Sequence, residues 1–410
     1  MSKNLSIIIP LFLVIIIDAM GMALVLPVVT SLMLNTHSPM LPADTSLFAR
    51  NIFYGLTLLL YPLGMFFGAP ILGDLSDRFG RKRIILTCLL GAAVGYVLSG
   101  LGVAITSISL LLFGRFFCGL MAGSQPIAQA AIADITTGKQ RTITMSFIIL
   151  AIALGVVFGP IIGGSLSNLP LAHDENYVAP FLVATLLALI NSAWLRRSFN
   201  ETFKPQHQNK IQLTKGFNLF LYAFKNPGIR TLALVFLCFM LGWSLYFQNL
   251  PLYLTKHFGY TSLQVGLFIS FMGVCFSIAL GLLTRVTVKF MSNKGIAMLG
   301  LGIASLGIIA SLVFRQAVDQ WICVIPSAIF AALAYNAIIT SFTELADEKH
   351  QGLMMGVSGA VFAASWSLTG LMTALMNYLN PEIPTFLSAI LMLSGLLGLL
   401  KFRVRAIQAI

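Results

Sequence analysis

Asp18 is an acid inside an apolar stretch of membrane length, LFLVIIIDAMGMALVLPVV, which contains no basic residue. Ionisable side chains inside a membrane are costly and usually functional. A carboxyl group in apolar surroundings favours its protonated form, whereas a nearby cation favours its ionised form. Asp18 could therefore load and release a proton as its surroundings change. The alternatives are a static ion pair that holds two helices together and an aspartate that faces a polar seam.

A second charge, Arg115, lies in the apolar stretch LLLFGRFFCGLMAGSQPIAQAAIADIT. A guanidinium remains charged in a membrane, so it needs a partner there. Asp18 and Arg115 are the two charges that lie well inside the predicted spans, and they have opposite signs. We therefore predict that they form a proton-coupling pair, and that they are candidates for direct contact.

Composition indicates that membrane helices position these charges. Of the 410 residues, 58% are hydrophobic and 9% are charged, and the mean hydropathy is +0.92. A soluble domain usually has about 25% charged residues. Apolar runs of about 20 residues recur along the chain, as expected for helices that satisfy their own backbone hydrogen bonds in lipid. The predicted fold is therefore an all-α membrane protein.

We predict twelve transmembrane helices, so both chain termini lie on the same side of the membrane. The expected spans are 6–32, 53–73, 84–103, 107–131, 144–166, 178–196, 230–254, 260–284, 295–314, 321–343, 353–377 and 384–401.

Basic residues set the orientation, because Lys and Arg concentrate in cytoplasmic loops. With the N-terminus inside, the outer loops hold only Arg50, Lys256 and Arg315 of the 25 Lys and Arg residues, and Arg115 lies within a span. Both termini are therefore predicted to be cytoplasmic. This asymmetry also accounts for the formal net charge of +12 without a nucleic-acid partner.

The longest polar stretch, FNETFKPQHQNKIQLTKGFNLFLYAFKNP, separates two sets of six spans. We predict an N-terminal six-helix bundle over 1–198, a cytoplasmic linker over 199–229 and a C-terminal six-helix bundle over 230–410. Two such halves are typical of secondary transporters, which bind their substrates near the midplane between the halves.

The loop after the second span reads GDLSDRFGRKR. Gly73 and Gly80 permit close helix approach and a turn. The acid Asp77 can accept hydrogen bonds from a helix N-terminus or pair with an arginine. This pattern resembles the signature loop of the major facilitator superfamily, and so implies the major facilitator fold of two pseudo-symmetric halves. The resemblance also implies a conformational latch in which Arg78 and Arg81 are the partners of Asp77.

The fifth span contains GVVFGPIIGG, whose small residues permit close packing and whose proline can bend a helix. This stretch resembles the antiporter motif of proton-coupled drug exporters in that superfamily. The residues that match the motif are Gly155, Gly159, Pro160, Gly163 and Gly164.

The first and fourth spans resemble those of the tetracycline-exporter branch, and DEKHQGLMMG resembles the loop that leads into the eleventh span. Two departures stand out. Spans seven to twelve contain no mid-membrane acid or histidine, and the loop GLLTRVTVKFMSNKG lacks the aspartate of the signature loop. These departures argue against metal-tetracycline itself as the substrate.

The resemblance implies that the first, fourth, seventh and tenth spans line the central cavity. Aromatic and amide side chains on these spans suit an amphipathic organic ligand. Aromatic residues also anchor helices at membrane interfaces, and amides also bond between helices. The candidate substrate-binding residues are Gln125, Gln129, Trp243, Tyr246, Phe247, Gln248, Asn249, Tyr335 and Asn336.

The sequence thus predicts a proton-coupled antiporter that exports small amphipathic organic molecules or drugs by alternating access across a bacterial inner membrane. One alternative is a narrow-specificity carrier for a metabolite or metal chelator, in either direction, and another is a non-transporting receptor. There is no nucleotide-binding Gly-Lys loop and no metal-ligand spacing, so we predict no enzyme, cofactor or metal. The expected partners are the substrate, protons and the lipid bilayer, and we expect a monomer.

Overall fold

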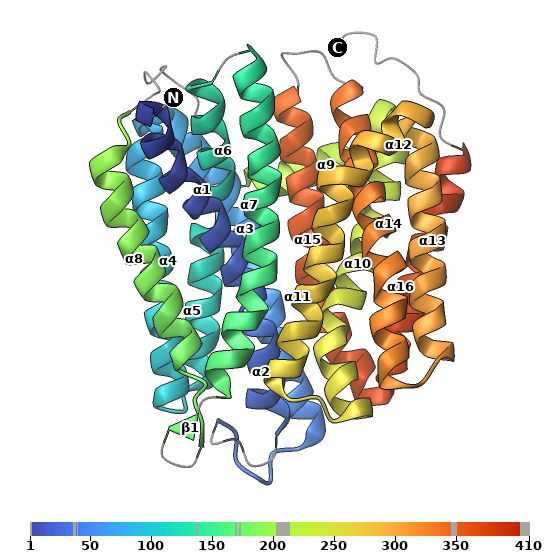
Figure 1. Cartoon of the computed structure of the whole chain (residues 1–410). Helices are drawn as coiled ribbons and strands as arrows, with labels where there is room; N and C mark the ends of the chain where they lie inside the picture. Colours follow the sequence, from blue (N-terminus) through green and yellow to red (C-terminus); the bar gives the residue numbers. More distant parts are fainter. Residues whose placement is uncertain are drawn as a thin grey trace. The chain divides into compact units, whose positions relative to one another are not determined.

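A computed structural model of the chain describes residues 2–35, 38, 40–136, 138–168, 170–171, 174–201, 214–345 and 351–401. These residues are almost entirely helical (Figure 1). Within them, twelve helical stretches are long and apolar enough to cross a membrane. The prediction of an all-α membrane protein with twelve spans is confirmed.

The chain packs as two units. Unit 1 comprises Met1–Lys215 together with Tyr260–Ser270, and unit 2 comprises Gly216–Gly259 together with Phe271–Ile410. Part of the predicted linker, residues 202–213, lies outside the described residues, as do residues 346–350 before the eleventh span. The predicted domain bounds stay a prediction.

In unit 1, α1 packs against α6, α7 and α8, while α4 packs against α5 and α8. A two-residue antiparallel pair, β1 (Pro170–Leu171) and β2 (Asp174–Glu175), lies between α7 and α8. The helices are α1 (Ser2–Ala23), α2 (Val25–Leu34), α3 (Leu47–Phe79), α4 (Arg81–Ala104), α5 (Ile108–Met121), α6 (Ser124–Asp134), α7 (Gly138–Ser167) and α8 (Ala179–Ser198).

Two spans of unit 1 are interrupted, which the sequence analysis did not predict. The first span breaks at Leu24 between α1 and α2, and the fourth breaks between α5 and α6. A proline follows each break, Pro27 in α2 and Pro126 in α6. Proline has no N–H to donate, and its ring crowds the carbonyl four residues earlier. Polar backbone groups are therefore available at both breaks, inside the membrane-spanning region.

In unit 2, α10 packs against α15 and α16, and α13 packs against α14 and α16. A π-helical segment joins α11 to α12, and π-helical turns often occur at functional sites. The helices are α9 (Lys215–Lys225), α10 (Pro227–Phe258), α11 (Ser262–Ile278), the π-helix η1 (Ala279–Leu283), α12 (Thr284–Phe290), α13 (Asn293–Val313), α14 (Ala317–Glu344), α15 (Gln351–Leu379) and α16 (Glu382–Lys401). Residues 262–270 of α11 belong to unit 1, and residues 271–278 belong to unit 2.

Side-chain caps fix several helix starts outside the apolar stretches. The Ser46 hydroxyl accepts a hydrogen bond from Ala49 N–H at the start of α3, and Ser292 accepts one from Gly295 N–H at the start of α13. The first N–H groups of a helix have no intrahelical acceptor, so a serine at this position stabilises the start. These caps help to determine where each span begins.

Candidate functional site

Asp18 lies on α1, and its side chain is buried, with 6% exposed. The Ser124 hydroxyl donates a hydrogen bond to its carboxylate, and the Gln125 backbone N–H is a further donor. Ser124 and Gln125 are the first two residues of α6, where N–H groups lack intrahelical acceptors and the helix dipole favours an anion. The break in the fourth span thus provides the groups that hold Asp18.

Arg115 lies on α5 with only 2% of its surface exposed. Its Nη1 donates to the backbone oxygen of Gly21 at 3.1 Å, and its guanidinium lies over the Tyr61 ring, 4.7 Å from the centroid. Its buried Nε has no hydrogen-bond partner among the described residues. Within the part of the chain that the structure describes, no ion pair joins Arg115 to Asp18.

Tyr61 of α3 connects the surroundings of the two charges. Its hydroxyl donates to the backbone oxygen of Asp18 at 3.3 Å, while its ring lies under Arg115. Arg115 therefore contacts the same turn of α1 that carries Asp18, but the two charged side chains have different hydrogen-bond partners. The two predicted residues lie in the same unit, but the structure, over the residues it describes, joins them by no ion pair.

The signature loop turns at Gly80, whose φ of +98° suits glycine. A side chain at this position would also collide with Glu201. The Glu201 carboxylate accepts hydrogen bonds from the backbone N–H groups of Arg81, at 2.9 Å, and Lys82, at 3.1 Å, and so caps the start of α4. By contrast, among the described residues a Cβ at Gly73 would meet nothing within 4 Å, so the role of Gly73 in the latch stays a prediction.

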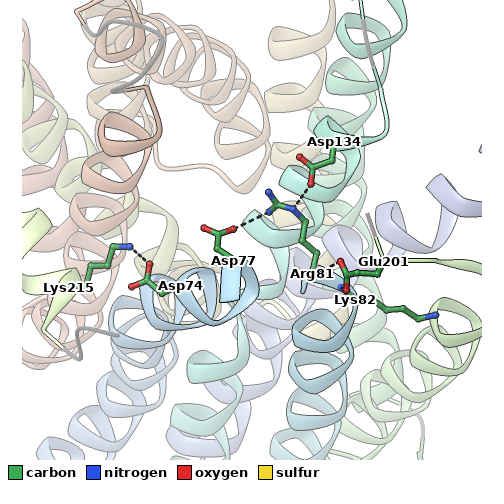
Figure 2. A network of polar contacts seen from close by, with 7 residues as sticks. All are labelled: Asp74, Asp77, Arg81, Lys82, Asp134, Glu201 and Lys215. Atoms are coloured by element: carbon green, nitrogen blue, oxygen red, sulfur yellow. Dashed lines mark hydrogen bonds and ion pairs between the residues drawn. The ribbon is translucent and has the colours of Figure 1, made fainter. Parts of the chain in front are cut away.

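Arg81 is the central side chain of this loop (Figure 2). Its Nε donates to Asp134 at 2.5 Å, while its Nη1 lies 3.9 Å from Asp77. The resemblance implied Arg78 as another partner of Asp77, but the Arg78 guanidinium lies over the Phe79 ring, 5.3 Å from its centroid. The structure therefore adds Asp134 and Glu201 to the network, neither of which the sequence reasoning selected.

A second ion pair forms beside the loop. Lys215, the first residue of α9, pairs with Asp74 near the end of α3 (Figure 2). Asp74 is one residue beyond Gly73, and its side chain is only 10% exposed. Positive charge within the predicted linker and negative charge at a helix end were both visible in the sequence, but their pairing depends on tertiary packing.

The glycines of the fifth span form two contact surfaces on α7. A side chain at Gly155, Gly159 or Gly163 would collide with the backbone of α1 or α2, or with the turn at Leu24 that joins them. One residue further along the chain, Gly164 lies directly against Ser262 of α11. These small residues therefore allow close backbone approach on both sides of α7.

The matching surface on α11 consists of Ser262, Gly266 and Ser270, spaced four residues apart. A side chain at Gly266 would meet the Pro160 backbone oxygen, and Ser270 donates to the Val157 oxygen at 2.6 Å. Within the same unit, Ser262 also shares a 2.7 Å hydrogen bond with Ser31 of α2. Sequence reasoning missed this surface, although small residues at i, i+4 and i+8 were a usable signal.

The predicted aromatic residues of unit 2 gather in one cluster. Trp243 stacks on Phe276 with ring centroids 5.7 Å apart, and it lies 6.5 Å from Phe247. Phe276 lies 6.5 Å from Tyr335. Tyr246 is also in ring contact with Trp243, at 6.0 Å. An aromatic surface of this kind could contact an organic ligand.

The predicted amides are distributed differently. The Gln248 amide donates to the Trp366 oxygen at 3.0 Å and to Thr369 at 3.1 Å. Asn249 donates to the Pro381 oxygen at 3.0 Å and to Thr385 at 2.9 Å. These amides bond between helices, which is the alternative reading of their role.

The other amides lie apart from the aromatic cluster or in unit 1. Asn336 lines a cavity of about 650 Å³ together with Asn293, Lys294 and Glu344. Gln125 and Gln129 on α6 are partly exposed. Their roles as ligand contacts stay predictions.

The described spans and the two helical units define a multi-pass membrane protein built like a transporter. The model of the Major Facilitator Superfamily matches residues 11–371. The chain belongs to this superfamily, whose members are membrane transporters and not enzymes.

Comparison with known proteins relates the chain to resistance proteins. Tetracycline resistance protein, class C, of Escherichia coli is 28% identical over 360 residues, which cover 86% of this chain and 85% of that protein. Multidrug resistance protein 2 of Bacillus subtilis is 23% identical over 384 residues, which cover 92% and 90%. A crystal structure of a D-xylose-proton symporter superimposes with a TM-score of 0.79 at 15% identity, covering 99% of each chain, and shows the shared fold.

Proposed function

We propose that this transporter is a proton-coupled antiporter that exports small amphipathic organic molecules across a bacterial inner membrane, with both termini in the cytoplasm. The observation that carries the proposal is the setting of Asp18. This mid-span acid is buried, and its partners among the described residues are a hydroxyl and a helix N-terminus rather than a cation. Intramembrane acids in such positions commonly belong to proton relays.

Neutral partners matter for proton exchange. A carboxylate in a close ion pair with arginine would have to break that pair when it is protonated, which costs several kcal/mol in a buried site. Asp18 has no such pair within the described residues. Its protonation would instead weaken contacts with Ser124 and the start of α6. Because these contacts join the first and fourth spans, the proton load of Asp18 could bias the packing of the two spans.

Arg115 has a separate proposed role. Its guanidinium donates to the backbone oxygen of Gly21, one turn of α1 away from Asp18. Tyr61 contacts both residues, with its ring against Arg115 and its hydroxyl on the Asp18 backbone oxygen. A positive charge at this distance opposes any further cation in the same region. We assign Arg115 to the coupling machinery as the fixed charge, and Asp18 as the group that titrates.

Export of organic molecules is supported by the relatives and by the aromatic cluster. The relatives are named as tetracycline and multidrug resistance proteins. The aromatic side chains of unit 2 offer stacking surfaces, which suit amphipathic organic ligands. The signature loop would act as the latch, and the α7 glycines as the antiporter motif.

The test is substrate-driven proton movement in proteoliposomes that contain the full chain and an internal pH dye. We expect a drug gradient to move protons in the wild type, and Asp18→Asn to lose at least about tenfold of this flux. Asp44→Asn provides a matched control, because Asp44 is exposed in the loop before α3. Drug flux without proton movement, or full coupling in Asp18→Asn, would refute proton antiport through this residue.

A further inference from the structure

Trp366 of α15 was not among the predicted site residues, yet it belongs to the aromatic cluster of unit 2. Its ring centroid lies 5.3 Å from that of Phe247 in an edge contact, and 5.5 Å from that of Phe362 in a stacked one. The Gln248 amide donates to the Trp366 backbone oxygen at 3.0 Å. Both the backbone and the ring of this residue are therefore held in place by neighbouring groups.

The position of Trp366 along its helix is unusual for tryptophan. It lies near the middle of α15, which spans Gln351–Leu379, whereas tryptophans of membrane proteins favour the two interfaces. At an interface the indole N–H can reach water or lipid headgroups. Near mid-span it must find its hydrogen-bond partner within the protein or in a ligand.

The indole Nε1–H of Trp366 has no such protein partner among the described residues, although the side chain is only 6% exposed. An unsatisfied N–H group at this depth is costly, and it calls for an explanation. The cluster around it is not sealed: Phe276, Tyr335 and Phe362 are each partly exposed. A polar donor thus lies within an aromatic surface that has an accessible rim.

We propose that Trp366 is a specificity-determining residue of unit 2 whose Nε1–H donates a hydrogen bond to an oxygen acceptor on a planar aromatic substrate. The rings of Phe247, Phe362 and Trp243 provide the stacking surface, and the single N–H selects ligands with an acceptor at the ring edge. This inference rests on the proposed export of organic molecules, and it specifies which class of organic molecule unit 2 binds. Gln248 positions Trp366 through its backbone.

The test measures binding of two radiolabelled probes to the full chain in lipid nanodiscs. Metal-free tetracycline carries oxygen acceptors along the edge of fused rings, one of which is aromatic, whereas tetraphenylphosphonium is aromatic but has no acceptor. Trp366→Phe keeps an aromatic ring and removes the N–H together with the five-membered ring of the indole. We expect the Kd of tetracycline to rise about tenfold and that of tetraphenylphosphonium to change less than about twofold.

The control is Trp194→Phe, the same chemical change at an exposed residue of α8, which should alter neither Kd. Unchanged tetracycline binding in Trp366→Phe would overturn the inference, as would equal weakening of both probes in Trp366→Phe and Trp366→Tyr. Failure of the wild type to bind either probe would also overturn it. A loss of proton coupling with the probe selectivity intact would instead refute only the proposed antiport.

Discussion

Ser124 donates a hydrogen bond to the Asp18 carboxylate, and this bond joins two spans that are both interrupted helices. The bond favours the ionised acid over the protonated one. Removing it in Ser124→Ala leaves proton release less favourable, so a higher pH is needed for the same degree of release. We expect the pH midpoint of drug-driven proton flux to rise by about one unit.

The matched control for this prediction is Ser198→Ala. The Ser198 hydroxyl bonds to the Trp194 oxygen of its own helix, at 2.9 Å, in an exposed position. Its pH profile should superimpose on that of the wild type. A profile of Ser124→Ala that also superimposes on the wild type would show that the hydroxyl does not act on the titrating group.

Arg115 provides a test that separates stability from transport. A buried guanidinium loses its hydration, and this one recovers a hydrogen bond to Gly21 and a ring contact with Tyr61, without a carboxylate partner among the described residues. Replacement of buried charge by an apolar side chain of similar size is often neutral or stabilising. We expect Arg115→Met to keep or raise the thermal midpoint while transport falls about tenfold or more.

Thermal unfolding in detergent and proteoliposome flux, measured on the same preparation, check this expectation. Arg315→Met serves as the control, because it makes the same change at an exposed arginine. The Arg315 side chain is 74% exposed and lies 3.5 Å from Glu382. It should leave flux unchanged. A large loss of stability in Arg115→Met would mean that the residue is mainly structural.

Arg50 is a second buried arginine, after Arg115, and it holds the loop before α3. Its guanidinium donates to four backbone oxygens between Met33 and Thr45, at 2.7 to 3.3 Å, with 2% of the residue exposed. Lysine has three donors and no planar fork, so Arg50→Lys leaves at least one buried carbonyl without a donor. We expect the free energy of unfolding to fall by about 2 kcal/mol.

The measurement is the thermal midpoint of the purified protein, with Arg315→Lys as the same change at an exposed residue. The control should stay within about 0.5 kcal/mol of the wild type. Equal stability of Arg50→Lys and the wild type would show that the four hydrogen bonds are replaced by water.

The sequence predicted the twelve spans because hydropathy and length determine which segments can satisfy their backbone in lipid. It did not predict the breaks at Leu24 and before Ser124. Proline occurs near both, but Pro62 and Pro70 lie within the continuous helix α3, so proline alone does not identify a break. Whether a helix breaks near a proline depends on whether neighbouring helices provide partners for the freed backbone groups.

The same reasoning explains which site residues were found. The types and depths of Asp18 and Arg115 stand out in a linear sequence, whereas their partners, Ser124 and Tyr61, are common residue types at unremarkable positions. Arg50 was counted only as an outer-loop charge, because its four acceptors are backbone groups that composition does not reveal. Trp366 was missed because the span that carries it was not among those expected to line the cavity.

The signature loop allows a comparison between two carboxylates that share one arginine. The Arg81 side chain is 12% exposed, Asp134 is 29% exposed and lies at 2.5 Å, and Asp77 is 62% exposed and lies at 3.9 Å. Exposed ion pairs contribute little to stability. We expect Asp134→Asn to lower the free energy of unfolding by about 1 kcal/mol, and Asp77→Asn to lower it by less than about 0.5 kcal/mol.

Flux measurements on the same two variants separate stability from the latch. If Asp77 acts as a latch, Asp77→Asn loses transport while its thermal midpoint stays close to that of the wild type. A stability loss in Asp77→Asn as large as that in Asp134→Asn would instead make Asp77 a structural partner of Arg81.

Ser31 and Ser262 offer a direct test of movement at the α7 contact surface. Their hydroxyl oxygens lie 2.7 Å apart, and cysteine differs from serine only in the sulfur atom, so Ser31→Cys with Ser262→Cys should place two thiols within bonding reach. Alternating access in this class of transporter requires packed helices to separate and close again. Oxidation of the double variant should therefore abolish flux, and a reducing agent should restore it.

The two single variants, treated in the same way, control for the native cysteines, which are free thiols in this structure. Full flux in a double variant whose cross-link is confirmed by mass spectrometry would mean that α2 and α11 stay together throughout the transport cycle.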